Sequence, residues 1–286
     1  MSISIENFMV RQKMGEKEAL KAIKDAGFDC VDYSFYWSDE LHILDDNYAE
    51  YAKDLRKYMD EIGLVCNQTH ATFDFQPHME MSMSCKEYRD TVRSIEASGI
   101  LGAKCVVVHA LKTAHCDDEE YLEINRKFYK SLEDTAKKSG VKIGVENLFY
   151  YDKKCECHRG SFGNPKMLSA FVREMGTDNF CACIDLGHAS LVGYEPQDFV
   201  NGMDKGLIEA LHVQDNDYHG DRHVPPFHGG FNWEKIIESL KNYGYTGEIN
   251  FEVFWYLSNY PKELLPSALK HVANIGRYLE ERIGLN

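Results

Sequence analysis

The chain has 286 residues, of which 44% are hydrophobic and 27% charged, so it can bury a large core and belongs to neither the disordered nor the fibrous classes. Its formal net charge of −14, with no Lys/Arg run longer than a pair, argues against a protein that neutralises nucleic-acid phosphates. The N-terminal segment lacks a signal-peptide pattern and no stretch approaches the ~18 apolar residues that span a bilayer, so we expect a cytoplasmic protein without a membrane partner.

Short runs of β-forming residues alternate with amphipathic stretches along the whole chain, a pattern typical of βα units and a parallel sheet. In chain order, strands are expected at residues 2–6, 30–35, 64–71, 105–110, 142–147, 180–186, 210–215 and 248–254. Most helices should open with proline, serine, aspartate or asparagine, which favour a first turn or an N-cap. Their expected starts lie near Glu16, Tyr48, Ser84, Asp118, Pro165, Pro196, Asn232 and Pro261.

The ends of these helices and the absence of linkers indicate how the units are combined. Several helices should end at a glycine, which favours a left-handed C-cap; the candidates are Gly27, Gly63, Gly99, Gly140, Gly176 and Gly244. No Pro/Gly/Ser-rich linker divides the chain, and no GxGxxG or GxxxxGK phosphate loop follows an early strand. We therefore expect a single (β/α)8 TIM barrel of the α/β class, one domain over residues 1–286, rather than an open doubly wound sheet.

Titratable side chains stand at the ends of six expected strands. Side chains of a barrel strand point alternately toward the helices and the interior, so Leu211 and Val213 facing the helices leave His212 facing inward. The same parity turns the following side chains toward the barrel mouth: His70, His109, Glu146, Asp185, His212 and Glu252. A lone inward histidine or aspartate is usually a hydrogen-bonded core group, but six on successive strands favour a shared metal.

Two short motifs add further candidate ligands. Asp185-Leu-Gly-His188 carries two donors from a strand end into the next loop, and Asp221-Arg-His223 has the period of two that places both side chains on one side of an extended segment. The second motif lies in one of two long expected loops, residues 150–164 and 216–231, where a barrel usually builds its site.

These motifs resemble the xylose isomerase-like barrel superfamily, which includes sugar isomerases, ketose 3-epimerases, inositol-pathway enzymes and endonuclease IV. The segments QTHATF, VVVHA, GVEN, CIDLGHA, ALHVQDNDYHGDRH and NFEVF carry the resemblance, which covers nearly the whole chain. It implies that one divalent ion, Mn²⁺ or Zn²⁺ before Mg²⁺ or Co²⁺, is held by Glu146, Asp185, His212 and Glu252. The endonuclease IV branch adds matches at His70, His109, His188, Asp221 and His223, so the number of ions stays open.

The resemblance and the paired carboxylates together imply a metal-dependent isomerase or epimerase that acts on a small sugar, polyol or keto-sugar through an enediolate. Glu146 and Glu252 would transfer the proton, assisted by His188. Substrate contacts are expected from His70, His109, His188, Arg222, Trp37 and Phe73, although the aromatic residues, with Trp255, are equally credible as barrel packing. Arg222 is included because the epimerase branch has a substrate-binding arginine where this chain has Tyr218, and Arg222 is the candidate to replace it.

Two alternatives remain open from the sequence. The complete set of nine ligand types suggests a zinc phosphodiesterase of the endonuclease IV kind, which the acidic composition opposes. A metal-binding module without catalysis is the other alternative. Assembly as a homo-oligomer is also left open.

Overall fold

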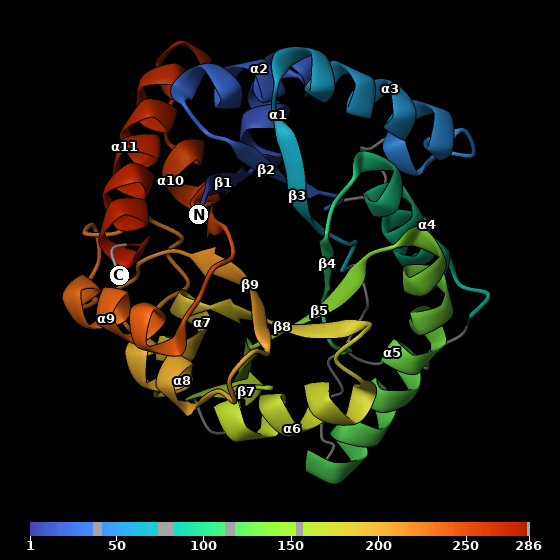
Figure 1. The fold of residues 1–286 in the computed structure, drawn as a ribbon, viewed down its shortest axis with the longest axis vertical. Helices are drawn as coiled ribbons and strands as arrows, with labels where there is room; N and C mark the ends of the chain where they lie inside the picture. Colours follow the sequence, from blue (N-terminus) through green and yellow to red (C-terminus); the bar gives the residue numbers. More distant parts are fainter. Residues whose placement is uncertain (37–41, 74–82, 112–117, 153–156, 285–286) are drawn as a thin grey trace.

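Eight parallel strands close into a cylinder that a ring of helices surrounds (Figure 1). The computed structural model describes residues 1–36, 42–73, 83–111, 118–152 and 157–284. The barrel strands are β1 (Ile3–Glu6), β2 (Cys30–Ser34), β3 (Val65–His70), β4 (Cys105–Val108), β5 (Lys142–Glu146), β8 (Phe180–Asp185), β9 (Ile208–Val213) and β10 (Ile249–Phe251). The expected (β/α)8 TIM barrel is confirmed.

The two ends of the chain close this cylinder. β1 pairs with β10 in parallel, with Ile3 opposite Ile249 and Ile5 opposite Phe251. β1 also pairs with β2, so the order around the barrel is β1-β10-β9-β8-β5-β4-β3-β2. All carboxyl ends of these parallel strands therefore meet at the same mouth.

Among the described residues, eight helices begin close to the expected positions, and α1 (Phe8–Met14), α7 (Leu186–Leu191) and α10 (Phe254–Ser258) were not expected. The eight are α2 (Glu16–Ala26), α3 (Tyr48–Ile62), α4 (Lys86–Leu101), α5 (Asp118–Ser139), α6 (Pro165–Met175), α8 (Pro196–Gly202), α9 (Trp233–Tyr243) and α11 (Leu265–Gly284), with 3-10 turns η2 (His42–Leu44) and η3 (Lys262–Leu264). Asn164 caps α6 by accepting from the backbone N–H groups of Lys166 and Met167, ahead of Pro165 in the first turn. Within the described ranges, no helix is long and apolar enough to cross a membrane.

One expected helix end is wrong. Gly99 lies inside α4, and the left-handed cap is Gly102, with a φ of 87°. A Cβ atom at Gly99 would lie 2.4 Å from the carbonyl oxygen of Ser139, at the end of α5. Gly99 is therefore required because two helices pack closely at this position. Sequence spacing alone cannot tell a glycine with this role from a glycine that caps a helix.

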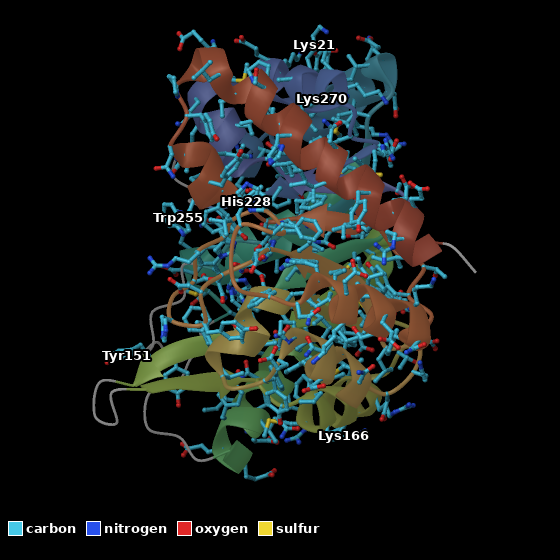
Figure 2. All side chains as sticks on the ribbon, turned by 90° about the vertical axis from the view of Figure 1, so that its left-hand side faces the viewer. Lys21, Tyr151, Lys166, His228, Trp255 and Lys270 are labelled. Atoms are coloured by element: carbon cyan, nitrogen blue, oxygen red, sulfur yellow. The ribbon has the colours of Figure 1, made fainter. Side chains whose placement is uncertain are left out.

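Three local structures differ from the expectation near the barrel mouth. Residues 150–164 were expected as a loop, but β6 (Leu148–Asp152) and β7 (Cys157–Ser161) form an antiparallel hairpin that projects from the body with Tyr151 on it (Figure 2). α7 starts directly after β8, so His188 lies on a helix rather than in a loop. β4 and β10 end one residue before His109 and Glu252, respectively.

The alternation of side chains along the strands follows the expected parity. Val106 and Val108 of β4 pack in the main core between strands and helices. A separate apolar cluster fills part of the barrel interior and consists of Cys105, Val107, Cys181, Cys183 and Ala210. Gly144 faces this cluster, because a Cβ atom there would lie 2.9 Å from the Sγ atom of Cys105. Inward positions of β4, β5, β8 and β9 are thus small and apolar one layer below the mouth.

Candidate active site

At the barrel mouth, three carboxylates converge on one imidazole nitrogen, and the four side chains come from consecutive βα units. The Nδ1 atom of His212 lies 3.1 Å from Glu146 Oε1, 3.5 Å from Glu252 Oε1 and 4.0 Å from Asp185 Oδ2. All four residues are buried. The structure therefore brings together the quartet, Glu146, Asp185, His212 and Glu252, that the sequence analysis proposed as metal ligands.

Two further histidines lie against the other oxygen of Glu146. His109 Nε2 is 2.9 Å from Glu146 Oε2, and His70 Nε2 is 3.6 Å from the same atom. The two Nε2 atoms are 3.2 Å apart. Because Glu146 belongs to both groups, these histidines continue the quartet toward β3 and β4.

A third group extends the site along the long β9–α9 connection. Asp221 Oδ2 lies 2.9 Å from His223 Nε2 and 3.7 Å from His188 Nε2. The first turn of α7 positions His188, since Asp185 caps that helix by accepting from the His188 backbone N–H at 2.7 Å. His188 Nδ1 is 3.2 Å from Glu146 Oε1, which links this group to the quartet.

The amide of Gln214 joins the third group to the quartet. Its Nε2 atom donates to Asp185 Oδ2 at 3.0 Å and to Asp221 Oδ1 at 3.1 Å. A Cβ atom at Gly187 would lie 2.4 Å from the amide carbon of Gln214. The glycine in the Asp-Leu-Gly-His motif thus leaves room for a side chain that orients two carboxylates.

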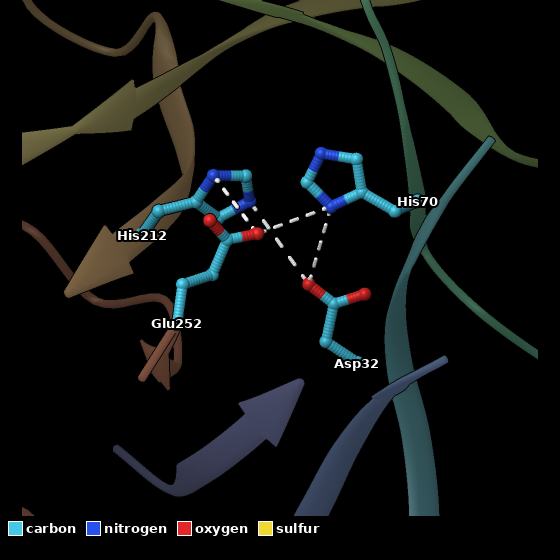
Figure 3. A group of neighbouring side chains, drawn as sticks. All are labelled: Asp32, His70, His212 and Glu252. Atoms are coloured by element: carbon cyan, nitrogen blue, oxygen red, sulfur yellow. Dashed lines mark ion pairs between the residues drawn. The ribbon is translucent and has the colours of Figure 1, made fainter. Parts of the chain in front are cut away.

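Asp32 is a member of this cluster that the sequence analysis missed (Figure 3). It is fully buried on β2, on the side of the cylinder opposite β8. Its Oδ2 atom accepts hydrogen bonds from Gln68 Nε2 at 2.7 Å and Asn250 Nδ2 at 2.9 Å, and lies 3.8 Å from His70 Nδ1. His70 Nδ1 is also 3.3 Å from Glu252 Oε1, so this histidine bridges Asp32 and the quartet.

Glu6, at the end of β1, is a second buried carboxylate that was missed. Its Oε1 atom accepts a hydrogen bond from the backbone N–H of Phe8 at 2.5 Å. Burial, reinforced by the charges of Glu252 and Asp32, raises the pKa of Glu6 to about 8. Glu6 is therefore protonated at neutral pH and adds no negative charge to the cluster.

Both missed carboxylates carry the same alternation signal as the residues that were identified. Val31 and Tyr33 flank Asp32, Ile5 precedes Glu6, and these three hydrophobic side chains are fully buried. Parity along the first two strands would have placed both carboxylates in the interior.

Burial and mutual contact shift the pKa values of the central groups. Burial alone would raise the pKa of Glu146, but His212 and His109 lower it well below its usual value. Burial alone would lower the pKa of His70, yet the nearby carboxylates of Asp32 and Glu146 raise it well above its usual value. Each carboxylate therefore favours the charged form of the imidazoles beside it, and the imidazoles favour the charged carboxylate.

The donor set fits a divalent metal ion. Ligand atoms of Glu146, Asp185 and His212 lie within 4.8 Å of one another. His70 Nδ1 and Asp32 Oδ1 are buried atoms with no hydrogen-bond partner among the described residues. Buried polar atoms left in this state are costly unless a metal or a charge satisfies them, and mixed carboxylate and imidazole ligands are typical of Zn²⁺ and Mn²⁺.

The remaining residues of the expected substrate site are distributed around the mouth. Phe73 stacks on His109, with ring centroids 4.7 Å apart and an interplanar angle of 18°. Arg222 is not brought into the cluster: it is exposed and its Nε atom lies 2.9 Å from Asp217 Oδ2. Trp255 is 48% exposed, so it does not pack inside the barrel. Trp37 lies outside the described residues.

Comparisons with known proteins agree with the barrel fold. A family model described as a xylose isomerase-like TIM barrel matches residues 20–275. An uncharacterised protein of Methanocaldococcus jannaschii is 29% identical over 220 residues, which cover 74% of this chain and 71% of the relative.

Solved structures with the same fold have lower sequence identity. A D-tagatose 3-epimerase-like protein has a TM-score of 0.73 and 22% identity, with 99% of this chain and 98% of the other covered. An IolI protein with a bound zinc atom also has a TM-score of 0.73, at 16% identity and with the same coverage of 99% and 98%. At such identities the likeness shows a shared fold.

Proposed function

Because the chain belongs to the xylose isomerase-like TIM barrel family, we propose that it is a metal-dependent isomerase or epimerase of a small sugar, polyol or keto-sugar. The family membership confirms the resemblance drawn from the strand-end motifs. The observation that carries the proposal is the convergence of Glu146, Asp185 and Glu252 on His212 Nδ1. The D-tagatose 3-epimerase-like and zinc-containing neighbours support the reaction class and the need for a metal.

The quartet, Glu146, Asp185, His212 and Glu252, would hold the divalent ion, Zn²⁺ or Mn²⁺ in the first instance. When bound, the ion supplies Lewis-acid polarisation of adjacent carbonyl and hydroxyl oxygens, which acidifies the carbon between them. His70 and Asp32 approach the same centre, and their unsatisfied buried atoms support a cation there.

Glu146 and Glu252 are the proposed proton carriers. They reach the centre from β5 and from the end of β10, which are not neighbours in the barrel. One carboxylate removes a proton from carbon; return by the other on the opposite face inverts that centre, whereas return to the adjacent carbon isomerises the sugar. His188 and His109, which line the approach to Glu146, would hydrogen-bond the substrate oxygens.

Exchange of the carbon-bound proton with solvent tests this proposal directly. Purified protein loaded with Zn²⁺ or Mn²⁺ should incorporate deuterium from D₂O into a ketohexose or inosose substrate, as measured by NMR. Glu146→Gln and Glu252→Gln should each reduce exchange by about 10²–10⁴-fold, the usual contribution of a general acid or base. Glu234→Gln is the matched control, because Glu234 is exposed and pairs with Arg282 outside the site. Full exchange in both site variants would overturn the proposed roles.

A zinc phosphodiesterase is the second candidate, and the His188–Asp221–His223 group favours it. This group gives the cluster enough ligands for more than one ion, as clustered-zinc phosphodiester hydrolysis requires. The net charge of −14 opposes binding of a nucleic acid. Cleavage of a DNA duplex with one abasic site by the zinc-loaded protein would select this alternative, and its absence alongside deuterium exchange would reject it.

A further inference from the structure

A cavity of about 540 Å³ opens beside the buried cluster, on the long β9–α9 connection. Asp217, Asp221 and Arg222 line one side, and Trp255 and Asn259 line another. The cavity shares Asp221 with the candidate site, and that carboxylate lies only 2.9 Å from His223 Nε2. Asp221 thus places the wall of this cavity directly beside the candidate site.

Trp255 is held at this position by a row of aromatic rings. The ring of His223 lies against Phe254 with a centroid distance of 3.9 Å, and Phe254 contacts Trp255 at 5.1 Å. Trp255 follows Glu252 by only three residues, at the start of α10, and is 48% exposed. Figure 2 shows Trp255 at the edge of the molecule near His228, which also lines the cavity.

Polar groups surround this exposed indole. Asn259 Nδ2 donates to the backbone carbonyl of Trp255 at 3.0 Å, and both residues line the cavity. Arg222 and Asp217 form an exposed ion pair at 2.9 Å. With Asp221, the cavity contains two carboxylates and one guanidinium, a balance that disfavours a phosphate or another anion.

We propose that this cavity binds a second, uncharged sugar ring that is joined to the reacting ring. This inference rests on the proposed function. A pyranose has an apolar C–H face that can lie on an exposed indole, and hydroxyl groups that pair with carboxylate, amide and guanidinium groups. The volume falls within the range of small-molecule sites. The substrate class is therefore a disaccharide or glycoside rather than a sugar phosphate.

Replacement of Trp255 tests this assignment. For a disaccharide such as lactose, maltose or cellobiose that exchanges deuterium, Trp255→Ala should raise KM about 10–100-fold, with the KM of the constituent monosaccharide unchanged. Trp255→Phe, which keeps an aromatic face, should retain most of the preference. Equal effects on disaccharide and monosaccharide, or no effect on either, would overturn the proposal.

Direct binding separates this proposal from the proposed reaction. Quenching of tryptophan fluorescence by each disaccharide, compared with glucose, should occur in wild type and disappear in Trp255→Ala. Such quenching without deuterium exchange for any sugar would refute the reaction and leave the sugar subsite standing. Exchange with monosaccharides alone, without disaccharide binding, would refute the subsite only. A Trp255→Ala protein that changes from dimer to monomer in sedimentation would mark this face as a subunit interface and overturn the subsite.

Discussion

The side chains of the barrel interior at and just below the candidate site form a layer with two halves of opposite character. Under β4, β5, β8 and β9 it is dry and apolar, and consists of Cys105, Val107, Cys181, Cys183 and Ala210. Under β1, β2, β3 and β10 it is polar, and includes Ser4, Asp32, Gln68 and Asn250. We call these the dry half and the hydrogen-bonded half. The barrel interior thus supports one site by apolar packing in one half and by hydrogen bonds in the other.

The two halves hold the residues above them through different forces. Cys183 and Ala210 of the dry half lie two residues before Asp185 and His212 on their strands, so apolar packing lies directly below these side chains. Polar contacts from Gln214 to Asp185 and from Gln68 to His212 then orient the side chains themselves. The hydrogen-bonded half instead fixes Asp32 through two side-chain amides. The comparison teaches that apolar packing lies below the site at β8 and β9, whereas side-chain hydrogen bonds support it at β2, and the latter support depends on every partner being present.

The largest effect is expected in the hydrogen-bonded half. Asp32→Ala should lower the free energy of unfolding by about 3–5 kcal/mol, because it leaves the buried amides of Gln68 and Asn250 without their acceptor and removes the carboxylate that lies 3.8 Å from His70 Nδ1. Urea unfolding of the metal-free protein at pH 7 measures this loss. Asp46→Ala, at a fully exposed partner of Arg93, is the control and should change stability by less than about 0.5 kcal/mol. A more stable Asp32→Ala protein would mean that charge repulsion outweighs the hydrogen bonds, and would break the comparison.

A smaller loss is expected in the dry half. Val107→Ala should lower the free energy of unfolding by about 2–3 kcal/mol, through lost apolar burial and the cavity left behind. Because no titratable partner is removed, the loss should be the same at pH 6 and pH 8. Metal affinity, measured by calorimetric titration with Zn²⁺, should stay within about twofold of wild type. A pH-dependent loss would contradict the assignment of this half as pure packing.

The smallest effect is a pH dependence that belongs to Glu6. Its pKa is about 8 in the folded protein, above the ordinary 4.5, so the folded state keeps a proton that the unfolded chain releases between these values. Stability therefore falls as pH rises through this window. Between pH 6 and pH 8 the metal-free wild type should lose about 2 kcal/mol that Glu6→Gln does not lose, since one pKa unit corresponds to about 1.4 kcal/mol. The free energy of unfolding of both proteins is measured by urea titration at each pH. If both lose the same stability between pH 6 and pH 8, Glu6 is ionised in the folded protein and the prediction is wrong.

Periodicity along single strands predicted the fold and most of the candidate site. His212 is recognisable because Leu211 and Val213 on either side are buried, and this signal needs only three consecutive residues. The same signal marks Asp32 and Glu6, which were missed because no ligand motif accompanies them. The roles of these residues as ligands and proton carriers stay predictions.

Pairing between distant segments was beyond sequence reasoning. The bond from Asn250 to Asp32 depends on β1 lying between β10 and β2, which follows from barrel closure and not from any local pattern. Gly99 illustrates the same limit. A glycine is needed there because Ser139 of another helix approaches its backbone closely, and sequence spacing gives no sign of this contact. The position of Arg222 is set by a neighbouring carboxylate, Asp217, rather than by the site.

The pairing of β1 with β10 also determines when the site can exist during synthesis. Glu252 follows the last strand, and that strand closes against the first one only after nearly the whole polypeptide has been made. Until then β1 and β9 each present an open edge, the kind of surface on which nascent chains associate wrongly. A chain that ends before residue 249 would therefore keep seven barrel strands with two open edges, and would lack both the closing strand and Glu252.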